Sequence, residues 1–201
     1  MFDDRFARRM ADRYRKKGLG KTAQRLVDLI AANGLDGATV LEVGGGVGEI
    51  HIELLKRGAA RATNLELSGA YEVQAQQLLT DTGLTERVQR RIVDIAASPQ
   101  EVEPADVVVL HRVVCCYPDY EKLLGAVADH ARRQVVFSHP PRNLVSRAVV
   151  AAQNAMFRLR GGEFRVFVHP PAAMRDVLAA RGMRPATISS RAAWHVSTAE
   201  R

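Results

Sequence analysis

The sequence predicts an α/β fold built on one mostly parallel sheet of seven strands, with helices on both faces. Short apolar runs that are typical of buried strands alternate along the chain with segments of helical periodicity. The last two strand-like runs are separated by too few residues for a crossover helix, so we expect them to form an antiparallel hairpin. With 201 residues and 47% apolar content, the chain (1–201) can form a single domain with one core.

The expected elements follow from this periodicity. Two helices at 3–17 and 21–33 form an amino-terminal helical cap over residues 1–36. The expected strands are 39–43, 62–67, 88–93, 105–111, 134–138, 186–190 and 193–197. The expected later helices are 49–57, 69–82, 120–131, 144–159 and 171–181.

The helix expected at 144–159 is apolar on more than one side. Its main stripe is Val145, Ala148, Val149, Ala152, Met156 and Leu159. We expect this stripe to rest on the domain, while Val150, Ala151 and Phe157 face a ligand or the amino-terminal cap. Because the helix follows the fifth strand, the insertion at 140–168 should lie near an acceptor pocket. We expect residues 144–159, together with the amino-terminal helices, to form a mobile cover over that pocket. An ordinary core helix is the alternative.

The charge is unevenly distributed along the chain, whose formal net charge is +7. Residues 1–26 carry nine Lys and Arg against three Asp and Glu, 27–131 carry eight against sixteen, and 132–201 carry twelve against three. Basic ends can attract an anionic substrate or a nucleic acid. The arginines are scattered, however, and 24 arginines in an Ala-rich chain also fit coding bias. We therefore do not expect a nucleic-acid partner.

The sequence also predicts the compartment. No apolar run reaches the roughly 18 residues that span a bilayer, and residues 1–21 lack the apolar core of a signal peptide. The two cysteines, Cys115 and Cys116, are adjacent, which suits neither a disulfide framework nor the spaced ligands of a zinc site. We expect a cytoplasmic protein without a bound metal ion.

A glycine loop between a strand and a helix, at 40–49, is the strongest local signal. Glycines at 44, 46 and 48 let the backbone turn sharply and approach a ligand closely. A dinucleotide fingerprint would need Gly or Ala at the position of Glu49. A carboxylate in the first helical turn opposes a pyrophosphate and suits a positively charged sulfonium cofactor, so we expect no affinity for NAD.

Glu42 followed by Gly44, Gly46 and Gly48 resembles the first motif of the class I S-adenosylmethionine-dependent methyltransferases. The resemblance covers about residues 39–140 and implies a Rossmann-like fold, with S-adenosyl-L-methionine as the cofactor. The closing hairpin expected above fits the same family's sheet.

The resemblance extends to the acids at the next two strand ends. It implies that Glu66 holds both ribose hydroxyls, with Leu67 beside it, and that Asp94 lies near the adenine amino group, with Ile95 beside the ring. The alternative is that the glycines only form a turn and the acids only cap helices. Acids at three successive strand ends favour the cofactor site.

The segment after the fourth strand should face the transferred methyl group. His111, next to the cofactor, can deprotonate an acceptor hydroxyl, and Tyr117 can orient one. A structural role for His111 is the alternative. Catalysis by a cysteine is less favoured, because neither thiol has an evident activating partner. After the fifth strand, His139 and Arg142 are candidates for binding the substrate.

The order of elements after residue 134 is also similar to the carboxyl-terminal half of the magnesium-protoporphyrin O-methyltransferases. That similarity does not carry the substrate over. We expect methyl transfer to a small-molecule acceptor, with O-methylation ahead of N- or C-methylation. An RNA or protein methyltransferase and a non-catalytic cofactor-binding protein are the alternatives, and the oligomeric state is not predicted.

Overall fold

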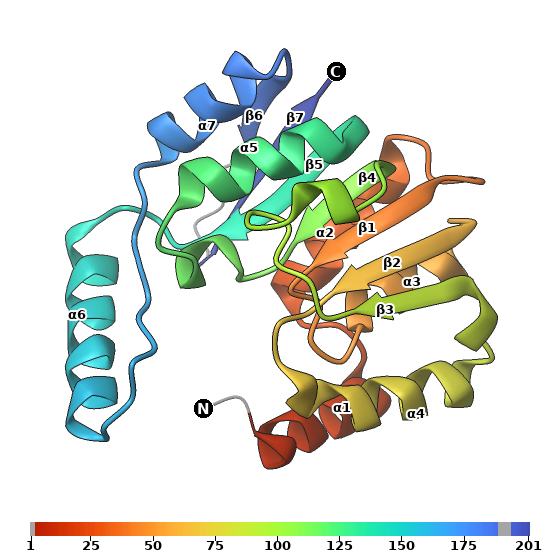
Figure 1. The fold of residues 1–201 in the computed structure, drawn as a ribbon, viewed down its shortest axis with the longest axis horizontal. Helices are drawn as coiled ribbons and strands as arrows, with labels where there is room; N and C mark the ends of the chain where they lie inside the picture. The colour runs from red at the N-terminus through yellow and green to blue at the C-terminus, as the bar shows by residue number, and fades with distance from the viewer. Residues whose placement is uncertain (1–2, 189–193) are drawn as a thin grey trace.

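A computed structural model describes residues 3–188 and 194–201. Its seven-stranded sheet lies between helical layers, in the order β3-β2-β1-β4-β5-β7-β6 (Figure 1). The strands are β1 Thr39–Val43, β2 Arg61–Leu65, β3 Val88–Arg91, β4 Ala105–Leu110, β5 Ala131–His139, β6 Arg184–Ile188 and β7 His195–Glu200. The helices are α1 Asp4–Lys17, α2 Lys21–Ala32, α3 Glu49–Lys56, α4 Glu72–Thr82, α5 Tyr120–His130, α6 Leu144–Leu159 and α7 Pro171–Ala180.

The strand directions match the predicted fold class. Strands β1 to β5 are parallel where they pair, while β7 is antiparallel to both β5 and β6. The predicted closing hairpin is thus confirmed. Its predicted ends at residues 189–190 and 193 lie outside the described residues.

Alternate residues of the strands enter two separate cores. Val40 packs in the core that α1 to α4 form on one face, and its neighbour Leu41 packs in the core that α5 and α7 form on the other. Both side chains are buried because a parallel sheet is covered on both sides. This three-layer arrangement leaves the carboxyl ends of the parallel strands as the open edge.

Two strand boundaries differ from the prediction in a way that matters for function. Strand β2 ends at Leu65, so Glu66 and Leu67 lie in the loop beyond the sheet. Strand β5 begins at Ala131, earlier than expected, and includes the exposed Arg132 and Arg133. The apolar run marked only the buried part of β5, because the pairing with β4 is irregular between Ala131 and Gln134, where Arg132 and Arg133 are exposed.

The predicted packing of α6 is wrong. No residue of α6 is buried, and the stripe that was expected to rest on the domain faces solvent, with Val145 72% exposed. The opposite side, which includes Val150 and Phe157, is half-buried. Figure 1 shows α6 standing away from the sheet, alongside the irregular segment that follows it. The alternative of a core helix is excluded as well.

Contacts with that irregular segment explain the orientation of α6. The side chain of Asn154 donates to the carbonyl of Val166 and accepts from its N–H, both at 2.8 Å. The rings of Phe157 and Phe164 meet edge to face, with centroids 5.6 Å apart. Neither contact can be read from helical periodicity, which records apolar spacing but not which side a partner occupies.

Candidate active site

A cavity of about 770 Å³ lies beyond the carboxyl ends of the parallel strands. Parallel α/β sheets bind their ligands at this edge. The cavity is lined by the predicted residues Glu42, Gly44, Gly46, Glu66, Leu67, Asp94, Ile95, His111 and Tyr117. Three other predicted site residues, Gly48, His139 and Arg142, are not among its lining. His139 is buried within the sheet, where its Nε2 lies 3.0 Å from the hydroxyl of Ser197.

The glycine loop passes too close to its neighbours for side chains. Gly44, Gly46 and Gly48 have positive φ angles of 67°, 55° and 92°. A Cβ at Gly44 would collide with Val113, and one at Gly48 would collide with the ring of His51. The loop therefore needs glycine both for its conformation and for its packing.

A buried polar cluster of Glu42, His51 and Asn64 packs against the glycine loop. Glu42 is 2% exposed, and its Oε2 lies 2.6 Å from His51 Nδ1 and accepts the backbone N–H of His51 at 3.2 Å. Asn64 Nδ2 lies 3.3 Å from the same ring nitrogen. The motif identified Glu42, but His51 and Asn64 were not predicted. A histidine between two isoleucines on a short helix was the only signal in the sequence.

Gly45 offers a direct test of this cluster. A Cβ there would collide with Asn64 Nδ2 and lie 2.7 Å from the Glu42 carboxyl carbon. Gly45→Ala is expected to destabilise the fold by about 1–3 kcal/mol, because the cluster is buried and cannot move aside freely. Denaturant unfolding measures this loss. Gly69→Ala, where a Cβ meets nothing within 4 Å, is the matched control. Equal stability of the two variants would contradict the rigid cluster.

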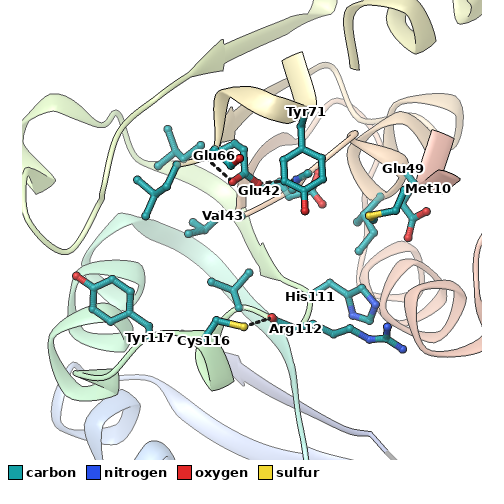
Figure 2. A pocket seen from close by; sticks show the side chains of 18 of the residues that line it. Met10, Glu42, Val43, Glu49, Glu66, Tyr71, His111, Arg112, Cys116 and Tyr117 are labelled. Carbon is teal, nitrogen blue, oxygen red and sulfur yellow. Dashed lines mark hydrogen bonds between the residues drawn. The ribbon is translucent and has the colours of Figure 1, made fainter. Parts of the chain in front are cut away.

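Glu66 projects from the end of β2 toward the cavity (Figure 2). Its Oε2 accepts the N–H of Gly46 and its Oε1 accepts the N–H of Ser68, both at 2.9 Å. Burial, followed by the charge of Glu66, raises the pKa of Tyr71, so this phenol stays protonated. The carboxylate is thus held in a fixed orientation beside the glycine loop.

Asp94 and Tyr117 form a second polar site. Asp94 Oδ1 accepts the N–H of Ala96 at 2.9 Å, and the Tyr117 hydroxyl donates to Asp94 Oδ2 at 2.9 Å. Burial and the bond to Asp94 raise the pKa of Tyr117 to about 12. Figure 2 shows Tyr117 on the opposite side of the cavity from His111. The structure therefore does not bring these two candidates together.

His111 lies at the other end of the cavity. Its Nδ1 is 2.9 Å from the hydroxyl oxygen of Ser138, which also accepts the backbone N–H of Arg112 at 2.9 Å. Arg112 has a φ of 60°, in the left-handed region. Burial, followed by the charge of Arg112, lowers the pKa of His111 to about 4. The imidazole is therefore neutral at physiological pH.

This pKa shift should make the fold sensitive to acid. An unfolded histidine has a pKa near 6.5, so the unfolded chain takes up this proton at a higher pH than the folded chain. The stability that the fold gains from keeping His111 neutral is fully present above about pH 6.5. It is lost as the pH falls toward 4. For His111 alone, the free energy of unfolding should decrease by about 2 kcal/mol between pH 7 and pH 5. Urea unfolding of the wild type and of His111→Gln at both pH values checks this. An identical pH dependence would contradict it.

Three arginines line the cavity, and one of them, Arg112, directly follows His111. Arg9 and Arg13, one helical turn apart on α1, line the cavity together with Arg112 and Glu49. The guanidinium carbon of Arg112 lies 4.8 Å from the ring centroid of Trp194, and burial followed by the charge of Arg13 lowers the pKa of Arg112. Burial followed by the charge of Glu42 raises the pKa of Glu49. The sequence interpretation missed these arginines, for which the spacing on α1 was the only signal.

The two cysteines are free, with sulfur atoms 3.7 Å apart. Cys115 is buried outside the cavity, and its hydrogen bond with Cys116 and its burial raise its pKa. Cys116 lines the cavity, and its thiol lies 3.4 Å from the carbonyl of Arg112. This arrangement gives Cys115 no access to a ligand.

Comparison with known proteins identifies the family. A family model described as a methyltransferase domain matches residues 10–187. The chain belongs to this methyltransferase family. No curated protein matches the sequence. The family and the fold make the chain a class I S-adenosylmethionine-dependent methyltransferase.

Solved structures share the methyltransferase fold. Magnesium protoporphyrin IX methyltransferase from Synechocystis PCC 6803, with bound SAH, superposes with a TM-score of 0.72 at 23% identity, over 90% of this chain and 82% of that chain. An O-methyltransferase family protein from Burkholderia thailandensis superposes with a TM-score of 0.71 at 20% identity. The match covers 100% of this chain and 63% of that chain. An O-methyltransferase family 2 protein from Planctomyces limnophilus, in complex with apigenin, superposes with a TM-score of 0.71 at 18% identity. The match covers 97% of this chain and 61% of that chain. The chain spans less than two thirds of the last two proteins.

The residues of the methyltransferase cavity fit the cofactor. The loop presents bare backbone, since a Cβ at Gly44, Gly45 or Gly48 would collide with a neighbouring side chain. Two carboxylates, Glu66 and Asp94, line the cavity beyond the ends of successive strands. Carboxylates accept hydrogen bonds from hydroxyl and amino groups, both of which an adenosine carries.

Proposed function

We propose that this methyltransferase methylates an oxygen atom of a small-molecule acceptor that carries a negative charge. The proposal rests on the positive charge of the cavity wall near His111, where Arg13 and Arg112 lie close to each other and to Glu49. Arg9, one helical turn before Arg13, lines the same cavity. Within the described residues, no ion pair engages any of these three arginines. The carboxylate of a cofactor would neutralise one of them at most, which leaves positive charge for an anionic acceptor.

Cofactor binding in this proposal divides the cavity into two ends. Glu66 holds the ribose hydroxyls, and Asp94, fixed by Tyr117, lies at the adenine end with Ile95 and Leu67 against the ring system. Glu42 and the glycine loop hold the amino-acid portion. When bound, S-adenosylmethionine supplies an electrophilic methyl group on a sulfonium sulfur. The methyl group would then lie between the glycine loop and His111.

His111 and the arginines act on the acceptor. A base whose pKa is about 4 is a poor match for a neutral hydroxyl, so we assign His111 the role of orienting the acceptor oxygen through a hydrogen bond. Ser138 fixes the ring of His111 through Nδ1. The arginines bind an acceptor that is already ionised, and alignment with the methyl group provides most of the rate enhancement.

The similar structures support a small-molecule acceptor. Two are titled O-methyltransferases, one of them in complex with apigenin, and a third is named for magnesium protoporphyrin IX. The amino-terminal cap, through α1, and the 140–168 insertion, through Phe164, both contribute to the lining of the cavity. We propose that these segments determine the size of the acceptor.

Two measurements test the proposal. Calorimetry should detect binding of S-adenosylmethionine and of its demethylated product, and no binding of NAD. Transfer of a labelled methyl group should then be measured with small carboxylic acids and acidic phenols, and with RNA and protein as competing acceptors. Mass spectrometry should locate the methyl group on oxygen. NAD binding tighter than that of the sulfonium cofactor would refute the cofactor assignment, and labelling confined to RNA or protein would refute the acceptor class.

Arg13→Gln tests the arginine assignment on the acceptor found in that screen. The variant is expected to raise the KM for the acceptor roughly tenfold or more, because a charge-assisted hydrogen bond is lost. The dissociation constant of the cofactor should change by less than about threefold. Arg8→Gln, at an exposed position on the same helix outside the cavity lining, is the matched control. A large change in cofactor affinity with an unchanged KM would place Arg13 on the cofactor instead.

A further inference from the structure

Helix α6 presents a continuous apolar surface to solvent. At about 100° per residue, eight apolar residues occupy neighbouring positions on an arc roughly 140° wide. They are Leu144, Val145, Ala148, Val149, Ala152, Ala155, Met156 and Leu159. We call this surface the apolar arc of α6. All eight residues are exposed, with Leu144 81% and Leu159 89% accessible.

Specific contacts hold the arc outward. The inner side of the helix is mixed in polarity: Asn154 pairs with the backbone of Val166, and Phe157 meets Phe164. A helix of a globular protein normally turns its apolar face to the core and its polar face to water. In α6 the apolar face is turned to water and the mixed face toward the protein. An exposed apolar patch of this kind marks an interaction site.

Arginines border the arc on both sides. Arg147 and Arg158 follow one edge of it and Arg160 follows the other, as the helical positions require. Helix α6 contains no acidic residue, and within the described part of the chain none of these three arginines forms an ion pair. The whole insertion at 140–168 contains five arginines and one glutamate. A broad apolar face with arginine borders is typical of helices that lie in the interface of an anionic bilayer.

We propose that α6 docks the methyltransferase onto a membrane surface that contains anionic lipid. The apolar arc enters the boundary of the acyl chains, while the arginines meet the headgroup phosphates. A second copy of the chain is a poorer occupant, because pairing two arcs would bring their arginine borders together. Attachment would be peripheral, since none of the helices among the described residues is long and apolar enough to cross a bilayer.

The position of α6 is compatible with docking. The helix stands apart from the sheet, so its outer side can approach a flat surface without a clash with the domain (Figure 1). The segment that runs back along α6 carries Phe164, which lines the cavity. A docked enzyme would therefore hold this wall of its cavity close to the lipid. Docking through the apolar arc of α6 does not depend on the nature of the acceptor.

Vesicle flotation with the full chain tests the proposal. Recovery with phosphatidylcholine vesicles that contain phosphatidylglycerol should exceed recovery with phosphatidylcholine alone by roughly tenfold or more. Val149→Glu should abolish the recovery. Val73→Glu, the same change at a 75% exposed position on α4, should leave it unchanged. Arg158→Gln should lower recovery roughly threefold or more, and Arg8→Gln should not. Cofactor calorimetry on each variant establishes that it is folded.

Other outcomes overturn the proposal. Equal recovery with both kinds of vesicle, or equal effects of the two valine variants, would show that the arc and its arginines do not bind anionic lipid. A dimer that Val149→Glu dissociates, without binding to vesicles, would assign the arc to a second copy of the chain. Absence of vesicle binding with capture by an acidic protein would assign it to a protein partner.

Discussion

Replacing Glu66 by alanine is expected to weaken S-adenosylmethionine binding by about 1–3 kcal/mol, or roughly fivefold to more than a hundredfold. The side chain holds the N–H groups of Gly46 and Ser68, and it presents the carboxylate that we assign to the ribose hydroxyls. Its loss therefore removes a charge-assisted acceptor and releases one anchor of the glycine loop. Isothermal titration calorimetry with S-adenosylmethionine and with its demethylated product measures the effect.

The control for this experiment is Glu86→Ala. Glu86 is an exposed carboxylate near the start of β3, and it does not line the cavity. It has the same charge as Glu66, so its removal reports any general electrostatic contribution to cofactor binding. Unchanged affinity in a folded Glu66→Ala protein would show that the ribose is bound elsewhere.

Replacing His111 by alanine is expected to lower kcat about hundredfold. The dissociation constant of the cofactor should remain within about twofold, because the imidazole is assigned to the acceptor oxygen and not to the cofactor. Single-turnover methyl transfer measures the rate, and equilibrium dialysis measures the cofactor. Ser138→Ala should have a smaller effect in the same direction, since Ser138 fixes only one nitrogen of the ring.

A conservative variant separates orientation from proton transfer. His111→Gln retains a hydrogen-bonding group and should recover part of the rate that His111→Ala loses, whereas it could not replace a base. Titration of His111 should cause no change in the wild-type rate between about pH 6 and pH 8, because burial keeps the pKa of His111 near 4. A rate that rises with a pKa near 7 and loses this dependence in both variants would instead make His111 a general base.

The sequence by itself determined the fold class and many of the residues that line the cavity. Alternating strand and helix periodicities predicted the parallel sheet, and the short spacing near the carboxyl terminus predicted the hairpin. The residues at the carboxyl ends of β1, β2 and β4 converge, because parallel strands end at one edge of the sheet. Glu42, Glu66 and His111 therefore line one cavity although they are far apart along the chain.

The tertiary structure alone decided which arginines line the cavity and how α6 is oriented. Arg9 and Arg13 reach the cavity because α1 packs against α4 and the turn at Gly69–Tyr71. A helical pattern cannot specify which neighbour a polar face meets. Tyr117 points toward Asp94 and not toward His111. It lies in a loop, where the position of a side chain depends on its hydrogen bond and not on helical or strand periodicity. On α6, periodicity located the apolar stripe, but the hydrogen bonds of Asn154 turned that stripe to solvent. Spacing fixes which residues share a face, whereas only the packed chain fixes what that face contacts.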